Sequence, residues 1–150
     1  MINLSKHGVI MINIVLGSTK KVVSSETLAA FFASNISLDG FLYIGYPIVG
    51  TAEGAYPIDA ILISKQTGLV LFNIIEGKNL DNYQENQDDV YNKLEAKLRL
   101  HKNLMKGRNL QVNISVVTFA PALNNLHDFS DIEYPVCNES NLKKWIENIS

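Results

Sequence analysis

The spacing of apolar residues along the chain predicts a series of helices and strands. Leu28, Phe31 and Phe32 recur at helical spacing after Ser24 and Ser25, either of which can cap a first helix over residues 27–33. Turn signals and apolar runs then predict the remaining elements. These are a strand within 8–17, strands at 41–49, 58–64 and 69–76, a long helix from 81 to about 106, a strand at 110–119, a short strand at 134–136 and a helix at 141–149.

The order of these elements defines the fold class. Strands joined by short turns are expected to be antiparallel neighbours, and the long helix is expected to carry the chain across to the next strand. The run at 69–76 is apolar on both faces until Asn73, as a buried central strand should be. We therefore predict an α/β fold with a mixed sheet of four to six strands flanked by helices, in the order α-β-β-β-α-β with a C-terminal helix.

Size and charge narrow the classes of function. The length of 150 residues suits a single domain over 1–150. Lys and Arg number 13 against 15 Asp and Glu, and this net charge of −2 excludes a domain that holds nucleic acid by bulk charge alone. The single cysteine, Cys137, excludes a disulfide-stapled domain. The apolar run at 8–17 is too short to span a membrane, so we expect a cytoplasmic protein without a membrane partner.

Three residues around one predicted hairpin carry the candidate chemistry. Asp59 begins one strand, and Glu76 and Lys78 stand at the end of the next strand, two positions apart. If that strand continues through Lys78, Glu76 and Lys78 project to the same face, beside Asp59. Carboxylates bind Mg²⁺ through oxygen, the metal activates a water, and a lysine adds positive charge near a scissile phosphate. Glu53, in the preceding loop, is a further carboxylate that this site can use.

These residues resemble the PD-(D/E)xK nuclease pattern, and the chain is similar to the nuclease-related domain, NERD, found at the N-terminus of superfamily I DNA helicases. The resemblance runs from about Ser25 to Pro121. Its segments are 25–28, 56–63, 67–72, 83–98 and 116–121. It implies a PD-(D/E)xK-like core in which Asp59 and Glu76 bind Mg²⁺ or Mn²⁺ and Lys78 orients the reacting groups. It also implies DNA as a partner, and a helicase region that follows in a longer chain.

The position of the acidic residue departs from the family pattern. In typical members it comes about five positions after the hairpin glycine, which here is Gly68. In that register Asn73 and Ile75 occupy the acidic and lysine positions, and the site is inactive. A β-bulge at Asn73 restores the active register, because one extra residue exchanges the faces of everything downstream.

The long helix carries basic residues on both sides of its apolar seam. Arg99, Lys102 and Lys106 flank one side and are candidates for phosphate contacts. Lys93, Lys97 and Arg108 flank the other side, and either group can instead remain solvated. His101 falls on the seam and is expected in the core, and Gln87 lies at the start of the same seam.

Two functions therefore remain open at this point. The first is a nuclease-related domain of a helicase-like, DNA-processing protein that cleaves phosphodiester bonds with Mg²⁺ or Mn²⁺ through Asp59, Glu76 and Lys78. The second is a degenerate form of the same domain, without a metal site, that docks a partner or positions DNA.

Overall fold

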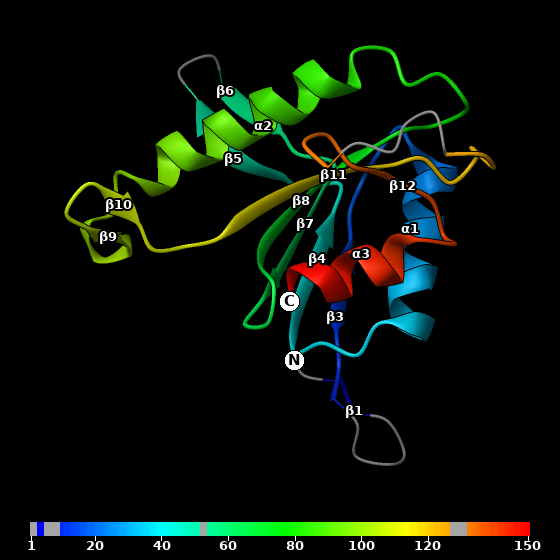
Figure 1. Cartoon of the computed structure of the whole chain (residues 1–150), viewed down its shortest axis with the longest axis horizontal. Helices are drawn as coiled ribbons and strands as arrows, with labels where there is room; N and C mark the ends of the chain where they lie inside the picture. The colour runs from blue at the N-terminus through cyan, green and yellow to red at the C-terminus, as the bar shows by residue number, and fades with distance from the viewer. Residues whose placement is uncertain (1–2, 5–9, 52–53, 127–131) are drawn as a thin grey trace.

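The computed structural model describes residues 3–4, 10–51, 54–126 and 132–150 (Figure 1). Its helices are α1 (Val22–Asn35), α2 (Tyr83–Leu98), α3 (Leu142–Ile149) and a short 3-10 helix, η1 (Lys102–Leu104). Its strands are β1 (Asn3–Leu4), β2 (Ile10–Met11), β3 (Asn13–Leu16), β4 (Gly40–Ile44), β5 (Pro47–Thr51), β6 (Gly54–Pro57), β7 (Ala60–Ser64), β8 (Gly68–Ile74), β9 (Met105–Lys106), β10 (Asn109–Leu110), β11 (Ile114–Phe119) and β12 (Val136–Cys137).

Six strands form one mixed sheet in the order β12-β11-β8-β7-β4-β3. Strands β4, β7 and β8 are antiparallel neighbours. A short turn joins β7 to β8, as predicted, whereas β5 and β6 lie between β4 and β7 in the chain. Helix α2 then carries the chain to β11, which pairs with β8 in parallel. The predicted α/β fold, with four to six strands and helices on both faces, is confirmed. Two further parallel pairs extend the sheet, β3 beside β4 and β12 beside β11.

The helices lie in two layers on either side of the sheet (Figure 1). Leu28 and Phe32 of α1 and Leu142 of α3 pack with Phe72 of β8 in the main core cluster. Val90 and Leu94 of α2 pack with residues of β7 and β8 in a second cluster. Strand β8 is therefore covered on both faces, as its continuous apolar run predicts. None of the helices among the described residues combines the length and apolarity needed to cross a membrane.

The predicted long helix is shorter in the structure. Helix α2 ends at Leu98, and η1 and the β9–β10 hairpin take the place of its expected last turns. The prediction that His101 belongs to the core is wrong, because His101 is exposed and Leu100 is 75% exposed. Leu98 is the last residue of α2 in the cluster on this face of the sheet. Beyond it the helical seam has no sheet to pack against, so its apolar spacing gains nothing from burial.

Two predicted strands are each divided in the structure. The run at 41–49 becomes β4 and β5, separated at Gly45, whose φ of +78° favours glycine. The N–H of Gly45 donates a 2.9 Å hydrogen bond to the backbone carbonyl of Asp59. Strand β5 then leaves the sheet and pairs with β6. The run at 110–119 likewise divides into β10 and β11, so that one apolar run supplies both a surface hairpin and a sheet strand.

The β7–β8 turn depends on a glycine with a left-handed backbone. Gly68 has a φ of +71°, and a Cβ atom at this position would lie 2.6 Å from the backbone oxygen of Asn113. We expect Gly68→Ala to lower the free energy of unfolding by about 3 kcal/mol, because backbone strain and an overlap with backbone act together. Urea denaturation measures this loss.

Gly107→Ala is the matched control for this substitution. Gly107 also has a positive φ, of +64°, but no atom lies within 4 Å of its built Cβ. Only the backbone strain remains there, so we expect a loss of about 1 kcal/mol. Equal losses for the two variants would contradict the proposed contact with Asn113.

Candidate functional site

Asp59 lies directly ahead of β7, beside the end of β8. Its Oδ2 accepts a 2.8 Å hydrogen bond from the N–H of Ile74 and a 2.7 Å hydrogen bond from Nζ of Lys21. Lys21 immediately precedes α1, so this ion pair links the start of the helix to the sheet. The side chains of Lys21 and Asp59 are 36% and 24% exposed. Water therefore screens the pair in part, and its contribution to stability is modest.

Glu76 lies two residues beyond β8 and caps α1 from outside the helix. Its carboxylate oxygens accept hydrogen bonds from the N–H groups of Val23, at 3.0 Å, and Ser24, at 2.7 Å. These N–H groups belong to the first turn, where a helix leaves its donors without internal partners. A negative charge is also favourable at this end of the helix dipole. Glu76 thus performs the task that Ser24 or Ser25 was expected to perform.

The predicted serine caps are displaced because α1 begins earlier than the apolar pattern indicates. The helix starts at Val22, so Ser24 and Ser25 both lie inside its first turns. The hydroxyl of Ser24 instead donates a 2.8 Å hydrogen bond to the backbone oxygen of Ile75. Ser24 therefore ties α1 to the end of β8 through its side chain, while its N–H binds Glu76.

The surroundings of Glu76 favour its charged form. The hydroxyl and N–H of Ser24 lower the pKa of Glu76 most, and the N–H of Val23 and the positive charge of Lys21 lower it further. Partial desolvation opposes this shift. Lys21 thus bonds to one of the predicted metal ligands and acts electrostatically on the other. The role of Lys21 was not predicted, because the predicted helix over 27–33 begins six residues after Lys21, whereas α1 begins at Val22.

Lys78 does not join this group. Strand β8 ends at Ile74, and Gly77, between Glu76 and Lys78, has a φ of +86°. The alternation that would place Glu76 and Lys78 on one face therefore does not extend to them. Lys78 is exposed, and among the described residues no hydrogen bond or ion pair connects it to Asp59 or Glu76.

Asn73 keeps the register that the family spacing associates with an inactive site. Strand β8 pairs with β7 from Gly68 to Phe72 and with β11 from Leu69 to Ile74, and neither register shifts. The bulge that would restore the active register is therefore not formed. Asn73 is buried and donates a 3.1 Å hydrogen bond to Oγ1 of Thr118 on β11.

A buried polar cluster surrounds Asn73. Gln87 of α2 donates to the same Thr118 Oγ1, at 2.8 Å, and to the backbone oxygen of Pro135, at 3.1 Å. Gln87 is only 2% exposed, so its predicted place on the apolar seam is correct, but its amide serves this cluster. The cluster is neutral and connects α2, β8 and β11. It holds no carboxylate that a cation would require.

The carboxylates of Asp59 and Glu76 are each occupied by partners within the protein. Each already accepts backbone N–H hydrogen bonds, and Lys21 supplies the positive charge that a bound metal ion would bring. Within the described ranges no group of three or more His, Cys, Asp or Glu side chains is placed to hold a metal. Glu53, the further carboxylate candidate, lies outside the described residues.

The predicted phosphate-binding residues gather at the other end of α2. Arg99 follows the helix, Lys102 lies in η1, Lys106 lies in β9, and Arg108 lies in the hairpin turn. All four side chains are exposed, and the stretch from 99 to 113 contains no Asp or Glu. Nη1 of Arg99 donates a 2.9 Å hydrogen bond to the backbone oxygen of Arg108. We call this stretch, residues 99–113, the basic tip.

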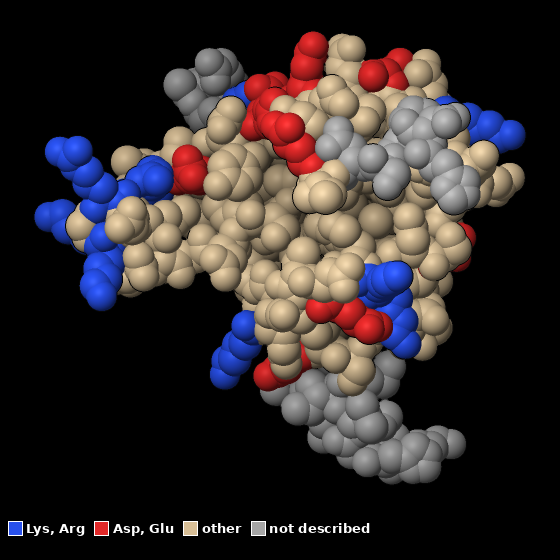
Figure 2. Space-filling model, viewed as in Figure 1, with Lys and Arg blue, Asp and Glu red and all other residues tan. Residues whose placement is uncertain are grey.

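The charge of the molecule is unevenly distributed. Figure 2 shows Lys and Arg gathered over the end formed by β9 and β10, and Asp and Glu placed mainly along α2. The acidic residues of α2 include Glu85, Asp88 and Asp89 in its first half. A net charge of −2 therefore conceals a surface with one strongly positive end.

Comparison of the chain with models of protein families, with curated proteins and with solved structures finds no match. The resemblance to nuclease-related domains therefore rests only on the residues named for it in the sequence.

The cap formed by Glu76 predicts a pH-dependent contribution to stability. Glu76→Gln keeps the shape of the side chain but removes its charge, so we expect a melting temperature lower by a few degrees at pH 7. Because folding lowers the pKa of Glu76, the stabilisation is complete above its ordinary value of 4.5 and is lost as the pH falls through the folded value. The melting curves of the two proteins should therefore converge in acid.

Glu139→Gln provides the control, because Glu139 is an exposed carboxylate and the N–H groups of Val23 and Ser24 bond to Glu76 instead. It should melt like the parent protein across the same pH range. A difference between Glu76→Gln and the parent that stays constant down to acid would argue against a charged cap.

Proposed function

We propose that this chain is a catalytically degenerate nuclease-related domain that positions nucleic acid for a helicase-like region of a DNA-processing protein. The resemblance selects DNA as the nucleic acid, and the basic tip carries the proposal. It presents Arg99, Lys102, Lys106 and Arg108 together on a stretch, 99–113, that contains no Asp or Glu. Glu95 of α2 lies 3.7 Å from Nε of Arg99 and balances part of that one charge. Such a cluster binds phosphates whatever the net charge of the chain, because screening limits the reach of the acidic residues farther along α2.

The bonding of the acidic residues supports the degenerate form of the domain over the active one. Asp59 is paired with Lys21, Glu76 caps α1, and Asn73 belongs to a neutral buried cluster. Each of these side chains stabilises the fold in its present arrangement. A metal-dependent reaction would require Asp59 and Glu76 to exchange these partners for Mg²⁺ or Mn²⁺, and Lys78 to approach them.

Positioning by the basic tip is tested by the affinity for DNA. Lys102→Ala/Lys106→Ala should weaken binding to labelled single-stranded and duplex DNA, measured by fluorescence anisotropy, about tenfold at low salt. The salt dependence should also become shallower, by a slope of about 0.9 for each lost contact with a duplex phosphate. Both residues are exposed, so the fold should be unaffected.

Lys143→Ala/Lys144→Ala removes the same charge from an exposed pair on α3 and serves as the matched control. The control should bind DNA like the parent protein. Equal losses in the two variants would show that binding follows net charge, and the basic tip would then have no special role.

The degenerate form also predicts the response to metals. We expect no saturable binding of Mn²⁺ in calorimetry and no cleavage of linear or supercoiled DNA with Mg²⁺ or Mn²⁺. Saturable Mn²⁺ binding that Asp59→Ala and Glu76→Ala both abolish would instead favour the nuclease, with Asp59, Glu76 and Lys78 as its residues. Circular dichroism of each variant separates loss of the metal site from loss of the fold.

A further inference from the structure

Strand β11 has a backbone edge along its first half with which no described strand pairs; we call it the open edge. Strand β12 pairs only with its last two residues, Thr118 and Phe119. The N–H of Thr118 donates to Pro135 and that of Ala120 to Cys137, at 2.9 and 2.8 Å, so these residues direct their backbone groups toward β12. Since backbone direction alternates along a strand, Ile114 and Val116 point their N–H and C=O groups to the same side. Among the described residues, no strand pairs with them on that side.

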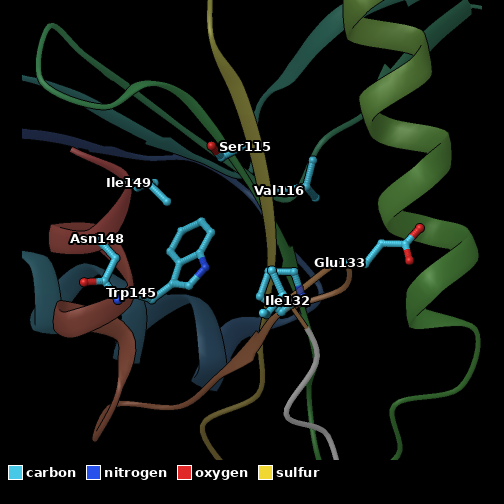
Figure 3. A pocket seen from close by; sticks show the side chains of 8 residues that line it. Ser115, Val116, Ile132, Glu133, Trp145, Asn148 and Ile149 are labelled. Atoms are coloured by element: carbon cyan, nitrogen blue, oxygen red, sulfur yellow. The ribbon is translucent and has the colours of Figure 1, made fainter.

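The open edge lies between two hollows, one on each face of the sheet. On the α3 side a groove of about 490 Å³ is lined by Ser115, Trp145 and Ile149. On the α2 side a smaller groove of about 200 Å³ is lined by Val116 and Asp88, among others. Figure 3 shows Ser115 and Val116 pointing to opposite sides of the strand, Ser115 toward Trp145 and Val116 toward α2.

The two grooves differ in chemistry. The α3 groove offers the half-buried indole of Trp145 and the side chain of Ile149, which extend the main apolar core to the surface. The α2 groove carries Asp88, whose carboxylate accepts a 2.9 Å hydrogen bond from the hydroxyl of Tyr134, together with Tyr91. Glu133 lines both grooves, and Figure 3 shows its side chain directed toward α2. A segment lying along the edge therefore has an apolar environment on one face and an acidic environment on the other.

We propose that the open edge of β11 binds an extended peptide of a partner protein, in which apolar and basic residues alternate, by adding it to the sheet as a strand. Main-chain hydrogen bonds to Ile114 and Val116 would supply affinity, and alternate side chains would enter the two grooves. The free edge, residues 114–117, is about 13 Å long at roughly 3.3 Å per residue. The chain already uses the rest of the same edge in this way, through β12.

The acidic residues beside the β11 edge favour a basic peptide over a second copy of the chain as the ligand of this edge. Antiparallel pairing of two β11 edges about a two-fold axis places the same face of each sheet on the same side. Asp88 and Glu133 of one copy would then approach their counterparts in the other, and like charges at an interface oppose association. A peptide with lysine or arginine at alternate positions meets these carboxylates with opposite charge.

A synthetic peptide of defined sequence serves as the probe for this site. The probe is a fluorescein-labelled peptide of alternating valine and lysine, flanked by glycine and blocked at its C-terminus. It should bind the protein saturably in fluorescence anisotropy. A peptide of the same composition with its valines and lysines in separate blocks should bind at least about tenfold more weakly, because it cannot serve both grooves at once.

Val116→Pro tests the backbone bond itself. The N–H of Val116 points away from β8, so proline removes no bond of the existing sheet and is tolerated at an edge. We expect about a tenfold loss of peptide affinity, since one backbone donor is lost and its acceptor is left unpaired. Thermal melting confirms that the variant is folded. Peptide affinity that is unchanged in the folded variant would overturn the proposal.

Asp88→Lys tests the charge of the α2 groove on an exposed side chain and keeps the proposal testable if the proline variant does not fold. It should weaken binding of the valine–lysine peptide and strengthen binding of a valine–glutamate peptide. Glu26→Lys makes the same change of charge on α1, beside the Leu16 end of β3 at the opposite edge of the sheet. It should leave both affinities unchanged.

Two further results would overturn the proposal. One is equal binding of the alternating and block peptides, which would indicate charge attraction without strand addition. The other is a dimer of the parent protein, detected by light scattering, that Val116→Pro converts to a monomer. That outcome would assign the edge to a second copy of the chain. Neither result bears on the basic tip, whose test uses DNA and different residues.

Discussion

The attachment of α1 to the end of β8 is the constraint on which the rest of the candidate site depends. Val23 and Ser24 present their N–H groups in the first turn of the helix, and Glu76 accepts both hydrogen bonds. Lys21 extends the attachment to Asp59, and Asp59 in turn accepts the N–H of Ile74. The start of α1, the residue ahead of β7 and the end of β8 are thereby linked by an ion pair and by hydrogen bonds to two carboxylates.

This attachment gives the nuclease-like placement of Asp59 and Glu76 a structural role that is independent of catalysis. Asp59 and Glu76 stand near one another in the fold because a hairpin brings a strand start beside a strand end. The same proximity makes both available to the helix, whose first turn needs acceptors and whose preceding lysine needs a counterion. A carboxylate that satisfies a helix and a lysine has less to offer a metal ion, because its charge is already balanced. On the face toward α2, the neutral cluster around Asn73 and Thr118 is consistent with that account.

The remaining surface divides into regions with different chemistry. The basic tip follows the last turn of α2. Arg99 pairs with Glu95 of that turn at 3.7 Å, and residues 99–113 themselves contain no Asp or Glu. The edge of β11 presents backbone groups between an apolar and an acidic groove. We propose nucleic acid as the ligand of the first region and an extended peptide as the ligand of the second. A domain that binds both would hold nucleic acid at the β9–β10 hairpin and a partner protein at the edge of the six-stranded sheet.

The sequence by itself determined the order of the elements and the identity of the core. Leu28, Phe31 and Phe32 line the buried face of α1, and β8 is buried on both faces, because apolar spacing is a local property that survives in any packing of the chain. It also located Asp59 and Glu76 near one another, since a hairpin is a local structure. The sequence did not determine which groups Asp59 and Glu76 bond to.

The tertiary structure decided what these residues bind. Glu76 bonds to a helix 53 positions earlier in the chain, and Asn73 bonds to Thr118, 45 positions later. The end of α2 at Leu98 was likewise set by the extent of the sheet and not by the helical seam, which continues to Met105 in sequence. Hydrogen-bond partners and helix ends depend on how segments far apart in the sequence pack together, and this packing is determined only in the folded chain.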